Sequence, residues 1–261
     1  MNDWLHVTRG DAPLIVSVPH AGTDLPTPFA DRLASPELAR IDTDWHVDRL
    51  YGFTSGLGAT LIITSISRTI IDMNRDPCGA SLYPGQTTTG LCPVTSFAGE
   101  PLYARGDEPN SAEIAARRKA YFDPYHAALD DEIARLKKIH AAIVIYDAHS
   151  ITSRVPRLFD GELPQFNIGT NGGVTCAPAL TAAIAGHCSD DTIVNGRFRG
   201  GWITRRLGNP AHGVHAVQME LAQRGYLNEY DTNWDVARAA PLQHTLRSIL
   251  TTCIDFAKGK P

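Results

Sequence analysis

The 261-residue sequence lacks the features that would place the protein in a membrane or outside the cell. No apolar run approaches the roughly 20 residues that a helix needs to cross a bilayer. The opening segment, MNDWLHVTRGDAP, has no basic stretch followed by an apolar one, so no secretory signal is expected. We therefore expect a cytoplasmic protein without a membrane partner.

Cysteine and net positive charge are also scarce. The five cysteines are scattered and never form a C-x-x-C pair, which predicts free thiols and neither a disulfide framework nor a cysteine zinc site. Twenty-four Lys and Arg residues stand against 28 Asp and Glu residues, giving a net charge of −4. Such a chain has no general attraction for phosphate backbones, so a nucleic-acid partner is not expected.

Short β-branched runs alternate with helical patterns along the chain. Strands are expected at 14–18, 60–64, 69–71, 143–146 and 214–219. Helices are expected at 37–53, at 111–140 with a bend at Pro124, at 178–185 and at 241–257. Because several strands are almost wholly apolar, this order predicts an α/β fold with helices on both faces of a sheet.

No linker or internal repeat divides the chain, so one domain over residues 1–261 is expected. Two segments rich in Pro, Gly and Thr, 78–109 and 153–174, predict long loops. Loops of this length often bind ligands or cover a site, and plain surface insertions are the alternative.

Polar residues follow three of the apolar runs directly. His20 follows LIVSV, His149 comes soon after IVIY, and Glu220 follows HAVQM. Parallel strands end at one edge of a sheet, which is where α/β proteins place their sites. Imidazoles and carboxylates are the usual zinc ligands, so these positions indicate a catalytic metal site. A histidine in such a position is, taken alone, more often a hydrogen-bonded structural residue than a metal ligand.

A third ligand is sought in DTDWHVD (42–48), at the start of an expected helix. We favour Asp44, which lies nearer the first turn and the sheet edge than Asp48 does. A helix-capping role is the structural alternative for Asp44.

Arginines form a second group, in SRTIIDMNRD (67–76). Arg68 and Arg75 flank an apolar run, and Asn74 stands beside Arg75. A guanidinium binds a carboxylate through paired hydrogen bonds, so these residues suit an anionic substrate. Internal ion pairs, for instance with Asp72 or Asp76, are the alternative.

At these residues the chain resembles the N-formylglutamate amidohydrolase (deformylase) family. The resemblance rests on segments that follow one another along nearly the whole chain: SVPHAGT (17–23), DTDWHVDRLY (42–51), SRTIIDMNRDP (67–77), YDAHS (146–150) and FRGGWITRRLGNPAHGVHAVQMELAQRGYL (198–227). That family is related to zinc carboxypeptidases and aspartoacylase-like deacylases. The resemblance implies a doubly wound, mixed and mostly parallel sheet, and a zinc site that another divalent metal could also fill.

The resemblance also implies roles for individual residues. His20 and His149 would be metal ligands, and Asn74 with Arg75 would bind a substrate carboxylate. Arg68 would polarise the scissile carbonyl, and Glu220, in its E-L-x-x-x-G-Y setting, would be the catalytic glutamate. The expected reaction is hydrolysis of a small acidic N-acyl amino acid, N-formyl-L-glutamate, to formate and glutamate in histidine degradation.

The acidic metal ligand departs from the carboxypeptidase pattern, which has it three residues after the first histidine. That position is Thr23 here, so Asp44 is preferred and Asp24 is the alternative. A second substrate carboxylate would need another cation, and Arg205, Arg206 or Arg199 could provide it. His215 could face the site if its side of the strand is the functional one.

Three other functions are compatible with parts of the pattern. The same chemistry on another acyl group would make a zinc carboxypeptidase or another deacylase. His46 and Asp48 have the H-x-D spacing of an Fe(II) oxygenase, although on a helix their side chains would diverge. A catalytically silent binding protein is the third. Serine-hydrolase and nucleotide-binding signatures, G-x-S-x-G and G-x-x-x-x-G-K-[ST], are missing.

Overall fold

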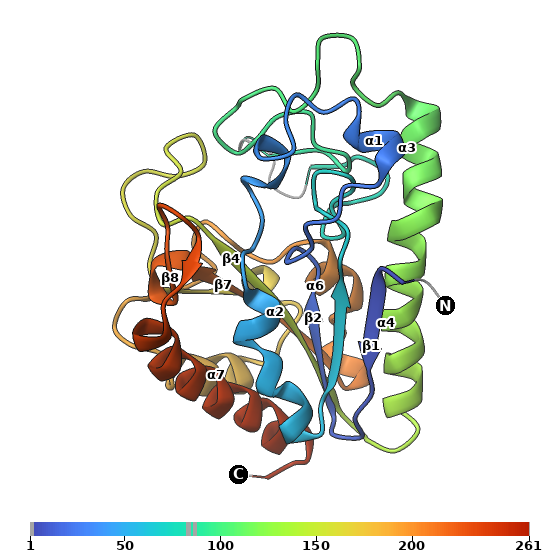
Figure 1. Ribbon diagram of the computed structural model, residues 1–261. Coiled ribbons are helices and arrows are strands. Elements are labelled where there is room, and N and C mark those ends of the chain that lie inside the picture. The colour runs from blue at the N-terminus through green and yellow to red at the C-terminus, as the bar shows by residue number, and fades with distance from the viewer. Residues whose placement is uncertain (1–2, 82–84, 86–87, 261) are drawn as a thin grey trace.

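The computed structural model describes residues 3–81, 85 and 88–260, and a seven-stranded sheet forms its centre (Figure 1). The strand order is β1-β3-β2-β4-β7-β5-β6. The strands of this sheet are β1 (Leu5–Thr8), β2 (Leu14–Val18), β3 (Thr60–Thr64), β4 (Ile143–Ile151), β5 (Phe166–Gly169), β6 (Thr192–Val194) and β7 (Val214–Ala222). Central strands β3, β2, β4 and β7 are parallel, whereas β1 and β5 run antiparallel to β3 and β7. The mixed, mostly parallel sheet is confirmed.

Helices cover both faces of the sheet, as expected. The α-helices are α1 (Thr27–Ala30), α2 (Val47–Leu50), α3 (Ser111–Arg117), α4 (Asp123–Leu136), α5 (Pro178–Ala185), α6 (Trp202–Leu207) and α7 (Val236–Ala257). Strand β2 shows why two layers are needed, because successive side chains point to opposite faces. Val16 packs in the cluster that contains Leu246 of α7, and Ile15 packs in the cluster that contains Leu129 of α4. Figure 1 shows α4 and α7 on opposite sides of the sheet.

The helix expected at 37–53 is broken in the structure. It consists of a 3-10 turn (Leu38–Arg40), the short α2 and a second 3-10 turn (Gly52–Leu57). His46, directly before α2, has a left-handed backbone with φ of 59°. Asp44 donates its backbone N–H to the carbonyl of His20 at 3.1 Å instead of continuing a helix. Tertiary contacts therefore override the local helical preference here.

The other predicted helices lie closer to the observed ones. The segment expected at 111–140 is α3 and α4, joined by a π-helical turn at Arg118–Phe122 just before Pro124, which has no N–H to continue the ladder. Helix α5 has the predicted bounds. Helix α7 begins earlier than expected, at Val236, because Asp235 caps it by accepting hydrogen bonds from two backbone N–H groups.

Strands β2 and β3 match their predictions, and β4 and β7 run further than expected, to Ile151 and Ala222. Residues 69–71 form a buried turn and no strand. Strands β1, β5 and β6 and the small pair β8 (Leu227–Asn228) and β9 (Asn233–Trp234) were not predicted. The described part of the 78–109 loop contains no helix or strand, with 82–84 and 86–87 outside the described residues, whereas 153–174 includes β5.

The extensions of β4 and β7 carry polar side chains into a buried part of the sheet. All nine residues of each strand are buried, including Asp147, His149 and Glu220. Buried polar groups need partners, so these side chains must satisfy one another or a ligand. Within the part of the chain that the structure describes, no helix is both long and apolar enough to cross a membrane.

Candidate metal centre and active site

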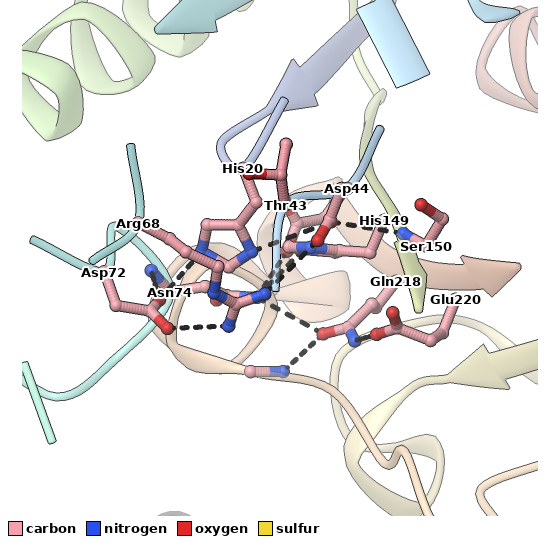
Figure 2. A network of polar contacts seen from close by, with 12 residues as sticks. His20, Thr43, Asp44, Arg68, Asp72, Asn74, His149, Ser150, Gln218 and Glu220 are labelled. Atoms are coloured by element: carbon pink, nitrogen blue, oxygen red, sulfur yellow. Dashed lines mark hydrogen bonds and ion pairs between the residues drawn. The ribbon is translucent and has the colours of Figure 1, made fainter. Parts of the chain in front are cut away.

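Three predicted ligands converge at the end of the central strands. His20 follows β2 by two residues, Asp44 lies in the turn before α2, and His149 belongs to β4. Each offers one ligand atom, and these atoms all lie within 4.8 Å of one another. Figure 2 shows the two imidazoles and the Asp44 carboxylate gathered around one point. All three residues are buried, with at most 2% of their surface exposed.

Two further carboxylates fix the orientation of the imidazoles. His20 Nε2 lies 2.8 Å from Asp72 Oδ1, and His149 Nε2 lies 2.9 Å from Asp147 Oδ2. A hydrogen on each Nε2 therefore donates to a carboxylate, which leaves the lone pair on Nδ1 for a metal. Metal-binding histidines in proteins are usually held in this way by a carboxylate on the far nitrogen.

The near side of the two rings has the donor set of a cation site. His20 Nδ1 lies 3.7 Å from Asp44 Oδ2, is buried, and has no hydrogen-bond partner among the residues that the structure describes. His149 Nδ1 lies 3.1 Å from the same oxygen. Lone pairs that face a carboxylate repel it unless a positive charge lies between them. These residues therefore fit a divalent metal with nitrogen and oxygen ligands.

The pKa shifts of Asp44 and His149 also indicate that a positive charge between them would be stabilised. Burial favours the neutral forms of Asp44 and His149, but their mutual contact outweighs it. The hydrogen bond from His149, together with the nearby His20 imidazole and Arg68 guanidinium, lowers the pKa of Asp44 below its usual value. The charge and hydrogen bond of Asp147 raise the pKa of His149 well above its usual value. Without a metal, a proton on His149 supplies the missing charge.

The loop that carries Asp44 is clamped by the segment after β7. Tyr226 donates its hydroxyl to the carbonyl of Trp45 at 2.7 Å, and Gln223 Nε2 donates to the carbonyl of Thr43 at 3.0 Å. The backbone N–H of Ser150 donates to Asp44 Oδ2 at 3.1 Å. The position of Asp44 is thus set by long-range contacts.

Arg68 lies inside this charge network. Its Nη1 is 3.2 Å from Asp44 Oδ1, and its Nη2 is 2.8 Å from Asp72 Oδ2. The guanidinium also lies over the Phe97 ring, 4.7 Å from the ring centre. The internal ion pair expected as the alternative role of this arginine is present. Arg68 also lines the pocket above the predicted metal ligands.

Glu220 lies beside the predicted metal ligands, on the next strand. Its Cα atom is the direct partner of the Cα atom of His149 in the parallel pair β4–β7. Gln218 Nε2 donates to Glu220 Oε2 at 3.0 Å. Burial raises the pKa of Glu220 to about 7, although the charges of His149 and Arg68 oppose this rise. A carboxyl poised near neutral pH suits a proton acceptor.

Asn74 also lies at the site, but its amide is already bonded to protein. Its Nδ2 lies 3.0 Å from Asp147 Oδ2, and its Oδ1 accepts from the backbone N–H of Ile203 at 2.8 Å. Gly201 makes room for it, because a Cβ atom there would lie 2.4 Å from Asn74 Nδ2. The structure thus places Asn74 behind the ligands, bonded to the same carboxylate as His149.

A pocket opens over these groups. Its described lining includes the predicted residues His20, Arg68, Asn74, Arg75, His149 and Glu220. Arg75 Nε donates to the Thr89 carbonyl at 3.1 Å, and its Nη2 lies 3.7 Å from Asp72 Oδ2. Arg75 is thus tied to the 78–109 loop on one side and to the ion-pair network on the other.

Two residues that were predicted to contact the substrate are not among the described residues that line this pocket. His215 is near the start of β7, where it accepts a hydrogen bond from the Ala177 N–H and packs on Phe256 of α7. Five residues separate it from Glu220, roughly 16 Å along a strand. Arg205 lies on α6 and donates through Nε to the carbonyl of Gly200, which precedes that helix. The structure does not bring either to the pocket.

The alternatives for the metal ligands also lie elsewhere. Asp24 is exposed and pairs with Ser65. His46 bonds through Nε2 to the carbonyl of Thr232, and Asp48 is exposed, so the H-x-D pair does not converge on a site. Of the cations considered for a second carboxylate, Arg206 pairs with Asp130.

Some residues at the site were not singled out from the sequence. Asp147 lies in the YDAHS segment, and strand alternation, which places residues two apart on one face, is the signal that links it to His149. Arg157 and Arg197 line the pocket from two loops. No sequence pattern signals them, because loop positions carry no periodicity.

The chain is similar to known proteins along most of its length. The N-formylglutamate amidohydrolase family profile matches residues 12–227. An N-formylglutamate deformylase of Pseudomonas aeruginosa is 43% identical over 260 residues, covering 96% of this chain and 97% of that protein. A deformylase of Pseudomonas putida is 41% identical over 255 residues, covering 96% of this chain and 95% of that protein.

Solved structures show the same fold. The crystal structure of an N-formylglutamate amidohydrolase from Ralstonia eutropha has a TM-score of 0.81 and 25% identity, with 98% of each chain covered. A protein of Agrobacterium tumefaciens has a TM-score of 0.71 at 21% identity, with 95% of each chain covered. The matched profile and the two Pseudomonas relatives show that this chain belongs to the N-formylglutamate amidohydrolase family.

Proposed function

We propose that the protein hydrolyses the formyl amide of N-formyl-L-glutamate to formate and L-glutamate, using a divalent metal held by His20, Asp44 and His149. The observation that carries the proposal is the convergence of these three buried ligands beside Glu220. The names of the Pseudomonas relatives support the choice of substrate. A cytoplasmic role in histidine degradation accords with the resemblance noted in the sequence.

Zinc is the metal we propose for this site. Two imidazoles and one carboxylate are a common set of three protein ligands for catalytic zinc, with a further position left for water. When bound, such a cation polarises a carbonyl and lowers the pKa of a water molecule toward about 7. Asp72 and Asp147 hold the ligand rings in the tautomer that this requires.

Glu220 is the proposed base. A buried carboxylate whose pKa is near 7 accepts the proton of the attacking water as the water oxygen bonds to the formyl carbon. Glu220 then gives this proton to the glutamate nitrogen as the C–N bond breaks, so formate and the free amine leave. Arg68, held by Asp44 and Asp72, is the proposed donor to the oxygen that gains charge on the formyl group.

Arg75 is proposed to bind the α-carboxylate of the substrate. It lines the pocket beside the His20–Asp72 pair and keeps about a fifth of its side chain exposed. Asn74 is proposed to act as a positioning residue, because its amide holds the carboxylate that orients His149. Arg205 and His215 have no part in this proposal.

The decisive experiment measures formate release from N-formyl-L-glutamate, with N-acetyl- and N-succinyl-L-glutamate as competing substrates. We expect rapid formate release that a chelator abolishes and zinc restores. Faster hydrolysis of another acyl group would indicate a deacylase, and release of a C-terminal residue from peptides would indicate a carboxypeptidase. Activity that survives complete metal removal would contradict the metal proposal.

A further inference from the structure

Positive charge dominates the pocket. Four arginines line it, Arg68, Arg75, Arg157 and Arg197, and Glu220 is the one carboxylate among its described lining residues. A cleft lined by one sign of charge attracts ligands of the opposite sign. The proposed substrate carries two carboxylates, and so far only Arg75 has been assigned to one of them.

Arg68 is poorly placed to bind the second carboxylate. Its two terminal nitrogens are bonded to Asp44 and Asp72, the residues that build and orient the metal site. The remaining donors of Arg68 are assigned to the formyl oxygen in the proposed reaction, so this guanidinium is not available to bind a substrate carboxylate as well. The remaining cations of the lining are Arg157 and Arg197.

Arg157 and Arg197 come from two loops that meet at the pocket. Arg157 lies in the loop after β4, and Arg197 follows β6. Arg197 Nε donates to the carbonyl of Leu158 at 2.8 Å, and the rings of Phe159 and Phe198 stack edge to face at 6.2 Å. Because these contacts join the loops, the two guanidinium groups belong to one wall of the pocket.

Arg157 is only lightly held by the protein. Its Nη1 lies 3.5 Å from the carbonyl of Ser96, the outer limit of a hydrogen bond. In the described residues no carboxylate forms an ion pair with it. Arg154 in the same loop differs, since it pairs with Glu162 at 2.6 Å outside the pocket.

The same wall also presents apolar surface. Ile151, Leu158 and Phe198 line the pocket together with the two arginines. A glutamate side chain has methylene groups followed by a terminal carboxylate. An apolar wall with cations of this kind is complementary to such a chain.

We propose that Arg157 and Arg197 form the specificity site for the side-chain carboxylate of the acyl amino acid, while Arg75 binds the α-carboxylate. This inference rests on the proposed function and goes beyond it, because it assigns the choice of an acidic side chain to two loop residues. The protein thus selects N-acyl amino acids with a terminal side-chain anion.

The test compares substrates that differ in one charge. Formate release is measured from N-formyl-L-glutamate, from N-formyl-L-glutamine, which lacks the side-chain charge, and from N-formyl-L-isoglutamine, which lacks the α-charge. Arg157→Ala and Arg197→Ala should each lower kcat/KM for N-formyl-L-glutamate about ten- to a hundredfold, chiefly through KM. Both should leave kcat/KM for N-formyl-L-glutamine nearly unchanged.

Controls separate a specific contact from general damage. Arg154→Ala removes a charge from the same loop outside the pocket and should keep wild-type selectivity. Arg157→Lys should restore part of the lost preference for glutamate. Arg75→Ala should instead reduce the preference for N-formyl-L-glutamate over N-formyl-L-isoglutamine.

Two outcomes would overturn the inference. One is an equal loss on the glutamate and glutamine substrates in both variants, and the other is a loss of selectivity for the α-carboxylate alone. If the wild-type protein releases no formate from any substrate, the proposed function fails by itself. Calorimetric binding of L-glutamate against L-glutamine then tests the site directly: a preference removed by Arg157→Ala supports it, and equal binding rejects it.

Discussion

His149 and Glu220 face each other across the parallel strands β4 and β7, with their Cα atoms in direct register. Register partners in a parallel pair point to the same face of a sheet, so the imidazole and the carboxylate share one side. The preceding pair on that face, Asp147 and Gln218, is in register as well. Backbone hydrogen bonds of the sheet therefore fix the proposed ligand, the proposed base and their supporting residues relative to one another.

Replacement of the proposed base should stop turnover without removing the metal. Glu220→Gln keeps the shape of the side chain but cannot accept a proton, so kcat should fall on the order of 10²- to 10⁴-fold. Metal content, measured by elemental analysis, should remain at the wild-type level. Glu162→Gln, on an exposed glutamate outside the pocket, should retain full activity. A wild-type kcat in Glu220→Gln would remove Glu220 from the mechanism.

Loss of the carboxylate behind His20 should weaken metal binding. In Asp72→Asn the amide is a poorer acceptor for His20 Nε2 and cannot neutralise Arg68, so the ring loses its fixed tautomer. We expect the metal affinity to fall roughly 10- to 100-fold in a competition titration with a chelator. Asp76→Asn changes a nearby carboxylate whose hydrogen bond within the described residues is to the Cys78 N–H, and should bind metal like the wild type. Equal affinities in the two variants would argue against a role for Asp72.

Gly201 lies so close to Asn74 that a side chain at position 201 should not be tolerated. A Cβ atom there would lie 2.4 Å from Asn74 Nδ2, and Asn74 is hydrogen-bonded to the carboxylate that orients His149. Gly201→Ala should therefore lower the free energy of unfolding by about 1–3 kcal/mol and also weaken metal binding. Gly52→Ala is the control, because a Cβ atom at that position meets nothing within 4 Å. Urea unfolding curves of both variants give the comparison, and unchanged stability in Gly201→Ala would refute it.

His126 should make stability fall in mild acid. Burial lowers its pKa from 6.5 to about 4, and its Nε2 donates to the carbonyl of Met73 at 2.9 Å. Between these values the unfolded chain binds a proton that the folded protein excludes. The contribution of neutral, buried His126 to the free energy of unfolding is therefore complete above pH 6.5 and is lost as the pH falls to about 4. At about 1.4 kcal/mol per pKa unit, the loss amounts to roughly 3 kcal/mol.

The measurement compares urea unfolding at pH 7 and pH 4.5. His126→Gln cannot titrate and can still donate to Met73, so its stability should fall less over this interval than that of the wild type. His244→Gln, on an exposed histidine of α7, should show the wild-type dependence. Parallel pH profiles for wild type and His126→Gln would contradict this assignment.

Much of the candidate metal site could be predicted from the sequence. Apolar strand runs end in polar residues, and parallel strands end at one edge of the sheet, so His20, His149 and Glu220 were expected together. The structure brings them together with Asp44. The sequence favoured Asp44 and left Asp24 as the alternative. The fold decided between them, because the position of Asp44 depends on a loop that Tyr226 and Gln223 hold from the far end of the chain.

Contacts between distant segments were beyond what the sequence could determine. Period and composition fixed the alternation of strands and helices, because each depends on neighbours a few residues away. Whether His215 lies at the site end of β7, or how Arg157 and Arg197 reach one wall, depends on register and on loop contacts made over long sequence separations. The tertiary structure alone decided these, since a side chain's partners are set by packing and local pattern carries no record of them.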